Sequence, residues 1–437
     1  MPDHPPSSQS HEPPVALCAR WIVPVASPPV ADGWLTVERG RIVSVGTAPP
    51  AGARRVDLGN AMILPGLINA HAHLEFSLLD KPLGEPGQPL PDWIRQVIAY
   101  RRTSHVDRAA AVAAGLAESQ RHGTVLIGEI ATGDWLPSWY QTEHATDAQQ
   151  AADAALRLVL FHELIGFRSQ TVSDRAGEAQ SRLTESIEQL PANLTPGLSP
   201  HAPYTVHPEL LRQLVALAEQ HGCPLAMHLA ESPEEMELLE HGTGPMQQLL
   251  QDAGVWEPDV IPRGTTPSDY LRALTSGRSR VLAVHCNYFS ADDVATAAAL
   301  RERLSVVYCP RTHAYFGHAR YPLAEMLAAG VRVVLGTDGR CSNPDLNVLN
   351  EVRHVAAHHP LPVQQVLQLV TRNAAEAFGL NNQLGTLEPT KLAELTVLSL
   401  PDGPEPADPL EWLLDERVQA IDWRSKMRGT FVDAPRT

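Results

Sequence analysis

The chain has few lysines and little basic charge. Only Lys81, Lys391 and Lys426 occur in 437 residues, so arginine supplies most of the 34 basic side chains, which face 50 acidic ones. The formal net charge is therefore −16, and Lys and Arg form no cluster along the chain. Because nucleic acids and anionic membranes are bound mainly through clustered basic residues, this composition argues against either as a partner.

Paired cysteines and long apolar runs are also missing. The five cysteines are scattered and form no C-x-x-C pair, which argues against a disulfide framework and fits a reducing compartment. The first residues, MPDHPPSSQSHEPP, lack the basic and apolar regions of a signal peptide. No uninterrupted apolar stretch reaches the ~18 residues that span a bilayer. These absences predict a soluble, cytoplasmic protein.

The chain does have a large apolar fraction, whose pattern changes twice. Hydrophobic residues make up 43% and charged residues 19%, which is enough to bury a core and excludes global disorder. Residues 1–14 are expected to form a mobile tail. Short β-type runs separated by Pro, Gly and Asp fill 15–65, and similar runs recur in 385–437. These two ends are predicted to meet in one small composite β-sandwich domain.

Residues 66–384 alternate short apolar strands with amphipathic helices. Runs such as TVLIGEI, RVLAVHC and VRVVLGTD are separated by runs such as PELLRQLVALAEQHG. Eight strand candidates in this order predict an α/β fold, a (β/α)₈ barrel of the TIM type. A doubly wound open sheet is the alternative, but no G-x-G-x-x-G turn follows a strand. Residues 234–280 are too long for a plain connection and are predicted to form a helical excursion over the barrel mouth.

Most strand candidates of the barrel end in a polar or ionisable side chain. In a barrel of this kind the C-terminal ends of the strands meet at one active site. In chain order these side chains are His71 and His73; Glu129; His162 and Glu163; His201; His228 and Glu231; His285; Arg311 and His313; and Asp338. Nineteen histidines placed at random would not choose strand ends so often. We therefore expect one common site.

Four of these side chains have the types and positions of a metal site. His71 and His73 are two residues apart on a strand, so both imidazoles point to the same face and can bind one ion. His228 ends a later strand. Asp338 follows the last strand, where it could instead cap the next helix. Together they form a His₃Asp set, which suits one Zn²⁺ ion, with Fe²⁺ or Mn²⁺ as alternatives.

Two further side chains are expected beside the metal. Glu231 lies three residues after His228 and cannot share its face of an ideal strand, but a turn after Leu229 would bring it back over the mouth. His285 follows four apolar residues and should be buried at a strand end. The alternatives are structural: a helix cap for Glu231 and a hydrogen-bonded core residue for His285.

The scarcity of lysine bears on the number of metal ions. Two-metal hydrolases on such barrels commonly bridge their ions with a carbamylated lysine on the fourth strand. Here the fourth strand ends at His201, and no lysine lies between Lys81 and Lys391. Glu129 or Glu163 could still bridge two ions, but one metal is the better interpretation.

In this order, the motifs LPGLINAHAHLEFS, SPHAPYTVHPELL, HLAES, VHC and GTDG resemble the amidohydrolase superfamily. The branch that they resemble includes S-adenosylhomocysteine, adenosine, guanine, cytosine and aminofutalosine deaminases and related chlorohydrolases. The resemblance implies that the His₃Asp set binds metal, that Glu231 and His285 handle protons, and that His201 contacts substrate. CPRTHAYFGH departs from the more usual CP-x-S-N. This makes Arg311 and His313 candidate substrate contacts, with polar loop residues as the alternative.

The resemblance also implies a reaction, the hydrolytic removal of an amino group from a heterocycle with release of ammonia. Asp338 would accept a proton from water, Glu231 would protonate a ring nitrogen, and His285 would stabilise the adduct. The same site could instead expel chloride or open a cyclic amide, and a non-catalytic barrel is the least favoured alternative. The expected partner is a small purine, nucleoside-like or pyrimidine molecule. Relatives are often homo-oligomers, so self-association is an open expectation.

Overall fold

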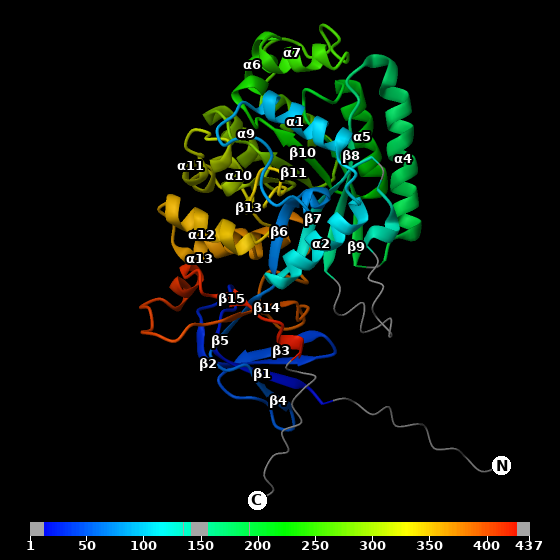
Figure 1. The fold of residues 1–437 in the computed structure, drawn as a ribbon. Helices are drawn as coiled ribbons and strands as arrows, with labels where there is room; N and C mark the ends of the chain where they lie inside the picture. Colours follow the sequence, from blue (N-terminus) through cyan, green and yellow to red (C-terminus); the bar gives the residue numbers. More distant parts are fainter. Residues whose placement is uncertain (1–12, 134, 141–155, 192, 426–437) are drawn as a thin grey trace, which may run out of the picture.

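Two β-sheets form the framework of the chain, which a computed structural model describes for residues 13–133, 135–140, 156–191 and 193–425. The larger sheet has eight strands in the order β13-β12-β11-β10-β9-β8-β7-β6, so neighbours in the sheet are neighbours in sequence. The strand bounds are β6 (Leu67–Ala72), β7 (Thr124–Ala131), β8 (Arg157–Leu164), β9 (Leu194–Pro200), β10 (Leu225–Leu229), β11 (Val281–His285), β12 (Leu304–Tyr308) and β13 (Val333–Leu335). Their pairings are parallel, and Figure 1 shows the helices around them.

The two edge strands of this sheet meet and close it into a barrel. Ala72 and Asp338 form a parallel bridge. The amides of Thr337 and Asp338 donate hydrogen bonds to the carbonyl of His71 at 3.1 and 3.0 Å. The prediction of a (β/α)₈ barrel is therefore confirmed.

The helices that cover the barrel begin and end where their sequences suggest. They are α2 (Arg108–Arg121), α4 (Val172–Gln189), α5 (Pro208–His221), α8 (Pro267–Leu274), α9 (Ala291–Ala299), α10 (Pro310–Tyr315), α11 (Leu323–Ala328), α12 (Val348–His358), α13 (Val363–Leu369) and α14 (Arg372–Ala377). In α5 the His207 ring accepts a hydrogen bond from the Glu209 amide at the N-cap, and left-handed Gly222 (φ 65°) ends the helix. Leu210 and Leu214 are fully buried, so its apolar stripe faces the strands.

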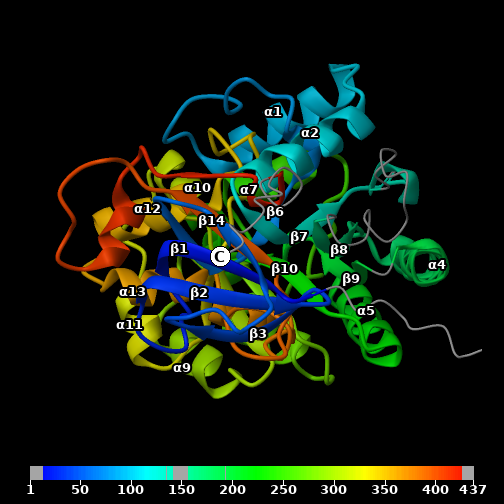
Figure 2. The same cartoon turned by 90° about the horizontal axis from the view of Figure 1, so that it is seen from below.

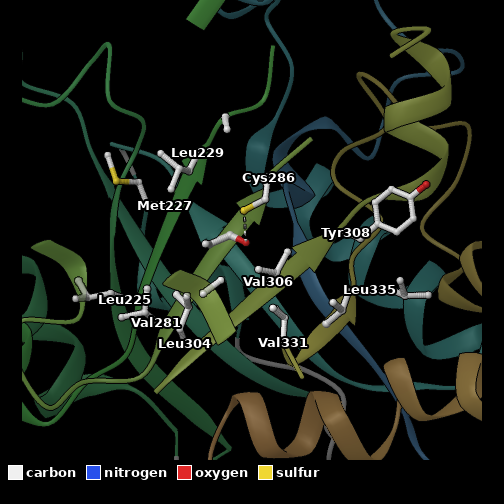
Figure 3. Packing of buried hydrophobic residues seen from close by; sticks show 14 of the residues in the cluster. Leu225, Met227, Leu229, Val281, Cys286, Leu304, Val306, Tyr308, Val331 and Leu335 are labelled. Atoms are coloured by element: carbon white, nitrogen blue, oxygen red, sulfur yellow. Dashed lines mark hydrogen bonds between the residues drawn. The ribbon is translucent and has the colours of Figure 1, made fainter. Parts of the chain in front are cut away.

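Two apolar layers lie on either side of the barrel strands. The outer layer packs strand residues such as Leu225 and Val306 against the covering helices, and Figure 3 shows this packing around β10, β11 and β12. The inner layer contains Phe161 and Val284 and is joined by Ala374 of α14, which lies against one end of the barrel. The barrel interior is therefore a packed core beneath the strand ends.

The second sheet joins both ends of the described chain. Its order is β15-β14-β5-β1-β2-β3, with β4 also paired to β1. The bounds are β1 (Val15–Ile22), β2 (Val30–Glu38), β3 (Arg41–Gly46), β4 (Arg54–Asp57), β5 (Ala61–Pro65), β14 (Leu395–Ser399) and β15 (Gln419–Ala420). The antiparallel pairing of β5 with β14 brings the two ends together. Viewed from below, β1 and β2 lie across that end of the molecule (Figure 2).

The run MILPGLINAHAHL forms two strands. β5 belongs to the second sheet and β6 to the barrel, with Gly66 between them. A Cβ at Gly66 would lie 2.3 Å from Val125 Cγ2, so the close approach of the strands requires glycine here. We propose that the boundary between the two domains lies at this residue. The predicted tail at 1–14 and the end of the C-terminal run fall largely within 1–12 and 426–437, which lie outside the described residues.

The expected helical excursion over the mouth is present. After β10 the chain forms α6 (Pro233–His241) and α7 (Pro245–Asp252) before it reaches α8. Together with α1 (Leu90–Thr103), these helices lie above the strand ends at the top of Figure 1. Across the described residues, no helix is long and apolar enough to cross a membrane.

Candidate active site

The four predicted metal ligands meet at the C-terminal ends of their strands. The Nε2 atoms of His71 and His73 lie 3.5 and 3.6 Å from Asp338 Oδ1. Nε2 of His73 lies 3.4 Å from Nε2 of His228. His71, His73 and Asp338 can offer ligand atoms that all lie within 4.8 Å of one another. All four side chains are buried.

An irregularity in β6 aims both histidines at the site. Ile68 and Ala70 face the barrel interior, so strict alternation would turn His71 away from it. The register between β6 and β7 shifts between Asn69 and Ala72. Such a shift re-aims the side chains that follow, which is a common use of β-bulges beside active sites.

A buried polar pair that was not recognised from the sequence motifs connects β6 to the residues that follow β13, beside these side chains. The Asn69 side chain donates to Thr337 Oγ1 at 2.8 Å and accepts from the Thr337 amide at 3.0 Å. Both residues are completely buried. An asparagine inside the apolar run LPGLINA was the signal that could have revealed this role, because a buried amide needs partners.

The hydrogen bonds of His228 determine which of its nitrogens faces the site. Its Nδ1 lies 3.0 Å from the carbonyl oxygen of His201. A carbonyl only accepts, so Nδ1 carries the hydrogen and Nε2 presents its lone pair to the other ligands. His201 itself is held by a 2.7 Å contact between its Nδ1 and Thr205 Oγ1.

Glu231 and His285 reach the site through left-handed backbone turns. β10 ends at Leu229, and Ala230 has φ 51°, which returns Glu231 to the mouth. His285 has φ 69° at the end of β11. Alternation would otherwise place it with Ala283 in the outer layer. His285 Nε2 lies 3.5 Å from Glu231 Oε1, so the two side chains form a pair beside the metal ligands.

The pKa values of the two carboxyl groups of the site are shifted in opposite directions. Burial, together with the charges of Asp338 and Glu235, raises the pKa of Glu231 well above its usual value. Burial also acts on Asp338, but the contact of its carboxylate with the His71 ring and the nearby His73 and His285 rings outweigh it and lower its pKa. Asp338 is therefore a carboxylate, while Glu231 retains its proton to a higher pH.

Three imidazoles of the site, those of His73, His228 and His285, have lowered pKa values and are neutral. Burial is the main cause that lowers the pKa of His73 and His228 well below the usual value and that of His285 to about 3. Neutral imidazole is the form that binds metal. His71 Nε2 is buried without a hydrogen-bond partner, so a ligand atom is available. Three imidazoles and one carboxylate fit a divalent ion of the zinc type.

A cavity of about 280 Å³ opens onto these residues. Its inner part presents the polar groups of the site, including His201, Glu231 and His285. Its outer part is apolar. The apolar side chains come from α1, α7 and the loop that follows α7, and include Trp93, Val97, Leu249, Leu250 and Val255. The cavity thus offers a polar floor and an apolar upper wall.

Comparison with known proteins now places this arrangement in a family. The model of the amidohydrolase family matches residues 62–433. The chain belongs to the amidohydrolase family. The resemblance carried by the motifs is confirmed.

Two relatives of this amidohydrolase are named 5-methylthioadenosine/S-adenosylhomocysteine deaminase. The protein from Nitratidesulfovibrio vulgaris is 33% identical and covers 85% of this chain and 80% of its own. The protein from Moorella thermoacetica is 30% identical, over 87% and 84%. The prediction of a hydrolytic enzyme of the deaminase class is confirmed by the family and these relatives.

Solved structures of low identity share the fold of this amidohydrolase. Aminofutalosine deaminase from Helicobacter pylori, in complex with methylthio-coformycin, has a TM-score of 0.76 at 21% identity and covers 92% of this chain and 95% of its own. An adenosine deaminase from Xanthomonas campestris with bound zinc has a TM-score of 0.68 at 23% identity, over 92% and 88%. Atrazine chlorohydrolase from Arthrobacter aurescens, complexed with zinc, has 0.71 at 19%, over 93% and 92%.

Two expected substrate contacts of this amidohydrolase lie elsewhere. Arg311 is not among the cavity residues, because its guanidinium is paired with Asp345 and Glu351. His313 is buried on α10, and its ring packs edge-on against Tyr308. The substrate-binding roles expected for Arg311 and His313 stay predictions, which these placements do not support. His201 does line the cavity, as the prediction requires.

The remaining ionisable side chains at the strand ends of this amidohydrolase point either outward or toward the barrel interior. His162 points outward, and its Nε2 lies 2.7 Å from Ser186 Oγ on α4. Glu163, the next residue, points into the cavity. Both carboxylate oxygens of Glu129 accept hydrogen bonds from the Leu74 amide at 3.1 and 3.3 Å. Glu129 thus holds the turn after His73 and is not itself a cavity residue.

Proposed function

We propose that this amidohydrolase deaminates a nucleoside-like heterocycle and releases ammonia. The observation that carries the proposal is the pair of carboxyl groups, Glu231 and Asp338, which line one cavity and whose pKa values are shifted in opposite directions. Hydrolytic deamination needs both an acid and a base, and such a pair supplies them at neutral pH. Two relatives named as nucleoside deaminases support the same reaction.

We propose that His71, His73, His228 and Asp338 hold one divalent ion, with zinc the expected metal. When bound, such an ion supplies Lewis acidity and lowers the pKa of a water molecule from 15.7 to about 7. The donor types support zinc, and two structures of the same fold contain it. The fourth strand, β9, has no lysine, which supports a single ion.

The side chains of the chain would move the protons. The Asp338 carboxylate can accept a proton from the attacking water. Glu231 can give its proton to a ring nitrogen, which makes the neighbouring carbon electrophilic, and can later help the amino group leave. His285, 3.5 Å from Glu231 Oε1, orients this acid and faces the developing oxyanion. General acid–base work of this kind typically contributes ~10²–10⁴ in rate.

The cavity wall supports a substrate with an uncharged substituent. The side chains contributed by α7, Leu249 and Leu250, are apolar, and α1 adds Trp93 and Val97. Arg311, a candidate substrate contact, is not among the residues that line the cavity. We therefore propose a purine nucleoside with a small apolar substituent, such as 5-methylthioadenosine, rather than the zwitterionic S-adenosylhomocysteine.

Replacing Glu231 by glutamine tests the reaction. Ammonia release should fall by ~10²–10⁴, while the purified variant should contain as much metal as the unmodified enzyme. The control is Glu237→Gln on α6, an exposed carboxyl group, which should retain full activity. Retained activity in Glu231→Gln would contradict the assigned role.

A substrate panel separates the alternatives. Ammonia should be released from 5-methylthioadenosine and adenosine, with the thioether preferred over S-adenosylhomocysteine. Chloride release from a chlorinated heterocycle, without ammonia from any amino-heterocycle, would favour the chlorohydrolase alternative. Purified protein with less than about half an equivalent of metal under metal-replete conditions would favour a non-catalytic barrel.

A further inference from the structure

Glu163 is a buried carboxyl group that the proposed reaction does not use. It lies at the end of β8 and shares the inner face of the strand with Phe161. Its side chain is only 5% exposed, and it lines the cavity. Its Oε1 atom is buried and has no hydrogen-bond partner. A buried acceptor without a partner is costly, so this oxygen is expected to have a ligand to bind.

Among the residues that the structure describes, this oxygen has no direct hydrogen-bond partner. The closest basic group is His201 Nε2, at 3.9 Å, which is too long for a hydrogen bond. Arg101 also lines the cavity, but its Nη2 is committed to Glu75 Oε1 at 2.6 Å. The Nε atom of Arg101 is buried without a partner as well. The cavity therefore contains an unpaired acceptor, Glu163 Oε1, and an unpaired donor, Arg101 Nε.

Glu163 lies on the far side of His201 from the proposed metal site. The rings of His228 and His201 have centroids 5.0 Å apart, and His201 Nε2 in turn lies 3.9 Å from Glu163 Oε1. His201 thus lies between the metal ligand His228 and Glu163. In a purine nucleoside the sugar is attached to the five-membered ring, remote from the reacting carbon. A base that reacts beside His228 would place its sugar beyond His201, near Glu163.

The chemistry of the pair favours hydroxyl groups over other ligands. A carboxylate oxygen accepts and an Arg N–H donates, and a hydroxyl can do both. An ammonium group would suit Glu163 alone, but it would be repelled by Arg101. A bridging role between two metal ions is not supported, because the potential metal-binding groups found among the described residues do not include Glu163.

We propose that Glu163, assisted by Arg101, binds the vicinal hydroxyls of the substrate's ribose and thereby selects ribonucleosides over free bases and deoxynucleosides. This inference rests on the proposed function, since it concerns the sugar of the same substrate. Glu163 is then a residue that determines specificity and positions the base over the metal ligands. It transfers no proton.

The test compares Glu163→Ala and Glu163→Gln with the unmodified enzyme on adenosine, 2′-deoxyadenosine, 3′-deoxyadenosine and 2′,3′-dideoxyadenosine. The unmodified enzyme should prefer adenosine to the dideoxynucleoside by about 10–100-fold in kcat/KM, as expected for hydrogen bonds to a charged group. In Glu163→Ala this preference should disappear, because activity on adenosine falls while activity on the dideoxynucleoside is retained. Glu163→Gln, which keeps the shape, should show an intermediate preference. Glu185→Ala, an exposed change on α4, is the control.

The outcomes separate this inference from the proposed function. An equal loss on all four nucleosides in Glu163→Ala, or no loss on adenosine, would overturn the role of Glu163 while leaving deamination intact. Failure of the unmodified enzyme to release ammonia from any nucleoside would contradict the proposed function. In that case equilibrium binding tests the inference. The unmodified protein should still bind adenosine more tightly than the dideoxynucleoside, and Glu163→Ala should bind the two nucleosides with equal affinity. Equal binding of both to the unmodified protein would overturn the inference.

Discussion

Replacing Arg311 by methionine should destabilise the fold and leave substrate binding unchanged. Arg311 Nε donates to Glu351 Oε1 at 2.7 Å, and its Nη1 donates to Asp345 Oδ2 at 2.8 Å. The Glu351 side chain is 0% exposed. Methionine retains much of the apolar volume but no charge, so the variant leaves a buried carboxylate without its counter-ion.

The size of the effect follows from what remains around Glu351. Breaking a buried ion pair by removing one partner typically costs about 3–5 kcal/mol. Two donors would stay in place, the Asn343 side chain at 2.8 Å and the backbone amide of residue 311 at 3.0 Å, so we expect the lower end. With a melting entropy of roughly 2.1 cal/mol/K per residue, a chain of 437 residues should lose about 3 °C in Tm.

The loss should grow with pH. Burial raises the pKa of Glu351 above its usual value, and the charge of Arg311 opposes that rise. Without Arg311 the folded-state pKa rises further, so the folded protein binds a proton that the unfolded chain releases. Stability is then lost as pH rises from the unfolded pKa, about 4.3, through the folded one. The Tm difference between Arg311→Met and the unmodified enzyme should be smaller at pH 5.5 than at pH 8.

Thermal unfolding at both pH values, together with kcat and KM, checks this reasoning. The double variant Arg311→Met/Glu351→Gln should recover much of the lost Tm, because the buried charge is then removed. The KM of the folded single variant should equal that of the unmodified enzyme. A raised KM with an unchanged Tm would refute the structural role and restore Arg311 as a substrate contact. A Tm loss independent of pH would refute the role of Glu351 ionisation.

Three further predictions concern the metal site. Gly336→Ala should weaken metal binding roughly 10-fold or more, because a Cβ there would lie 2.9 Å from His71 Cβ; titration against a chromophoric chelator measures this, and unchanged affinity would contradict it. Ser342→Ala removes the hydroxyl that donates to Asp338 Oδ2 at 2.7 Å and should lower metal affinity or kcat by about 10–100-fold with little change in Tm of the metal-loaded enzyme. Chelation should lower Tm, and one equivalent of Zn²⁺ should restore it. At a free Zn²⁺ concentration of 100 times the Kd, binding stabilises the fold by about 2.7 kcal/mol. A further rise in Tm with a second equivalent would indicate a two-metal site.

The strand ends of the barrel could be predicted because they combine two strong local signals. Each strand is a short apolar run, and in most cases a polar residue follows it at the point where parallel strands meet. The return of Glu231 over the mouth was also predictable. Glu231 lies three residues after His228, so the two cannot share one face of a strand, and a turn is needed to bring Glu231 back to the site. The proposed metal ligands could therefore be selected without long-range information.

The sequence could not predict side-chain directions that depend on a distant part of the chain. Arg311 follows β12 directly, as a substrate contact would, but Glu351 on α12 binds it. Nothing near Arg311 in sequence indicates that partner. The register shift in β6 also has no signal in the local sequence, since it depends on pairing with β7. Glu163 could be assigned to the inner face only once Phe161 was known to lie in the barrel core.

Backbone strain and function coincide in this site for a reason that can be stated residue by residue. His285 and Asp338 adopt left-handed φ values of 69° and 58°, a region that costs an L-residue roughly 1–2 kcal/mol. Glycine would remove that cost, as it does at Gly222 after α5. It cannot do so here, because the chain must turn at the same residues whose side chains face the cavity. The strain is tolerated because the seam between β6 and β13 and the buried layers around the strands hold those turns in place.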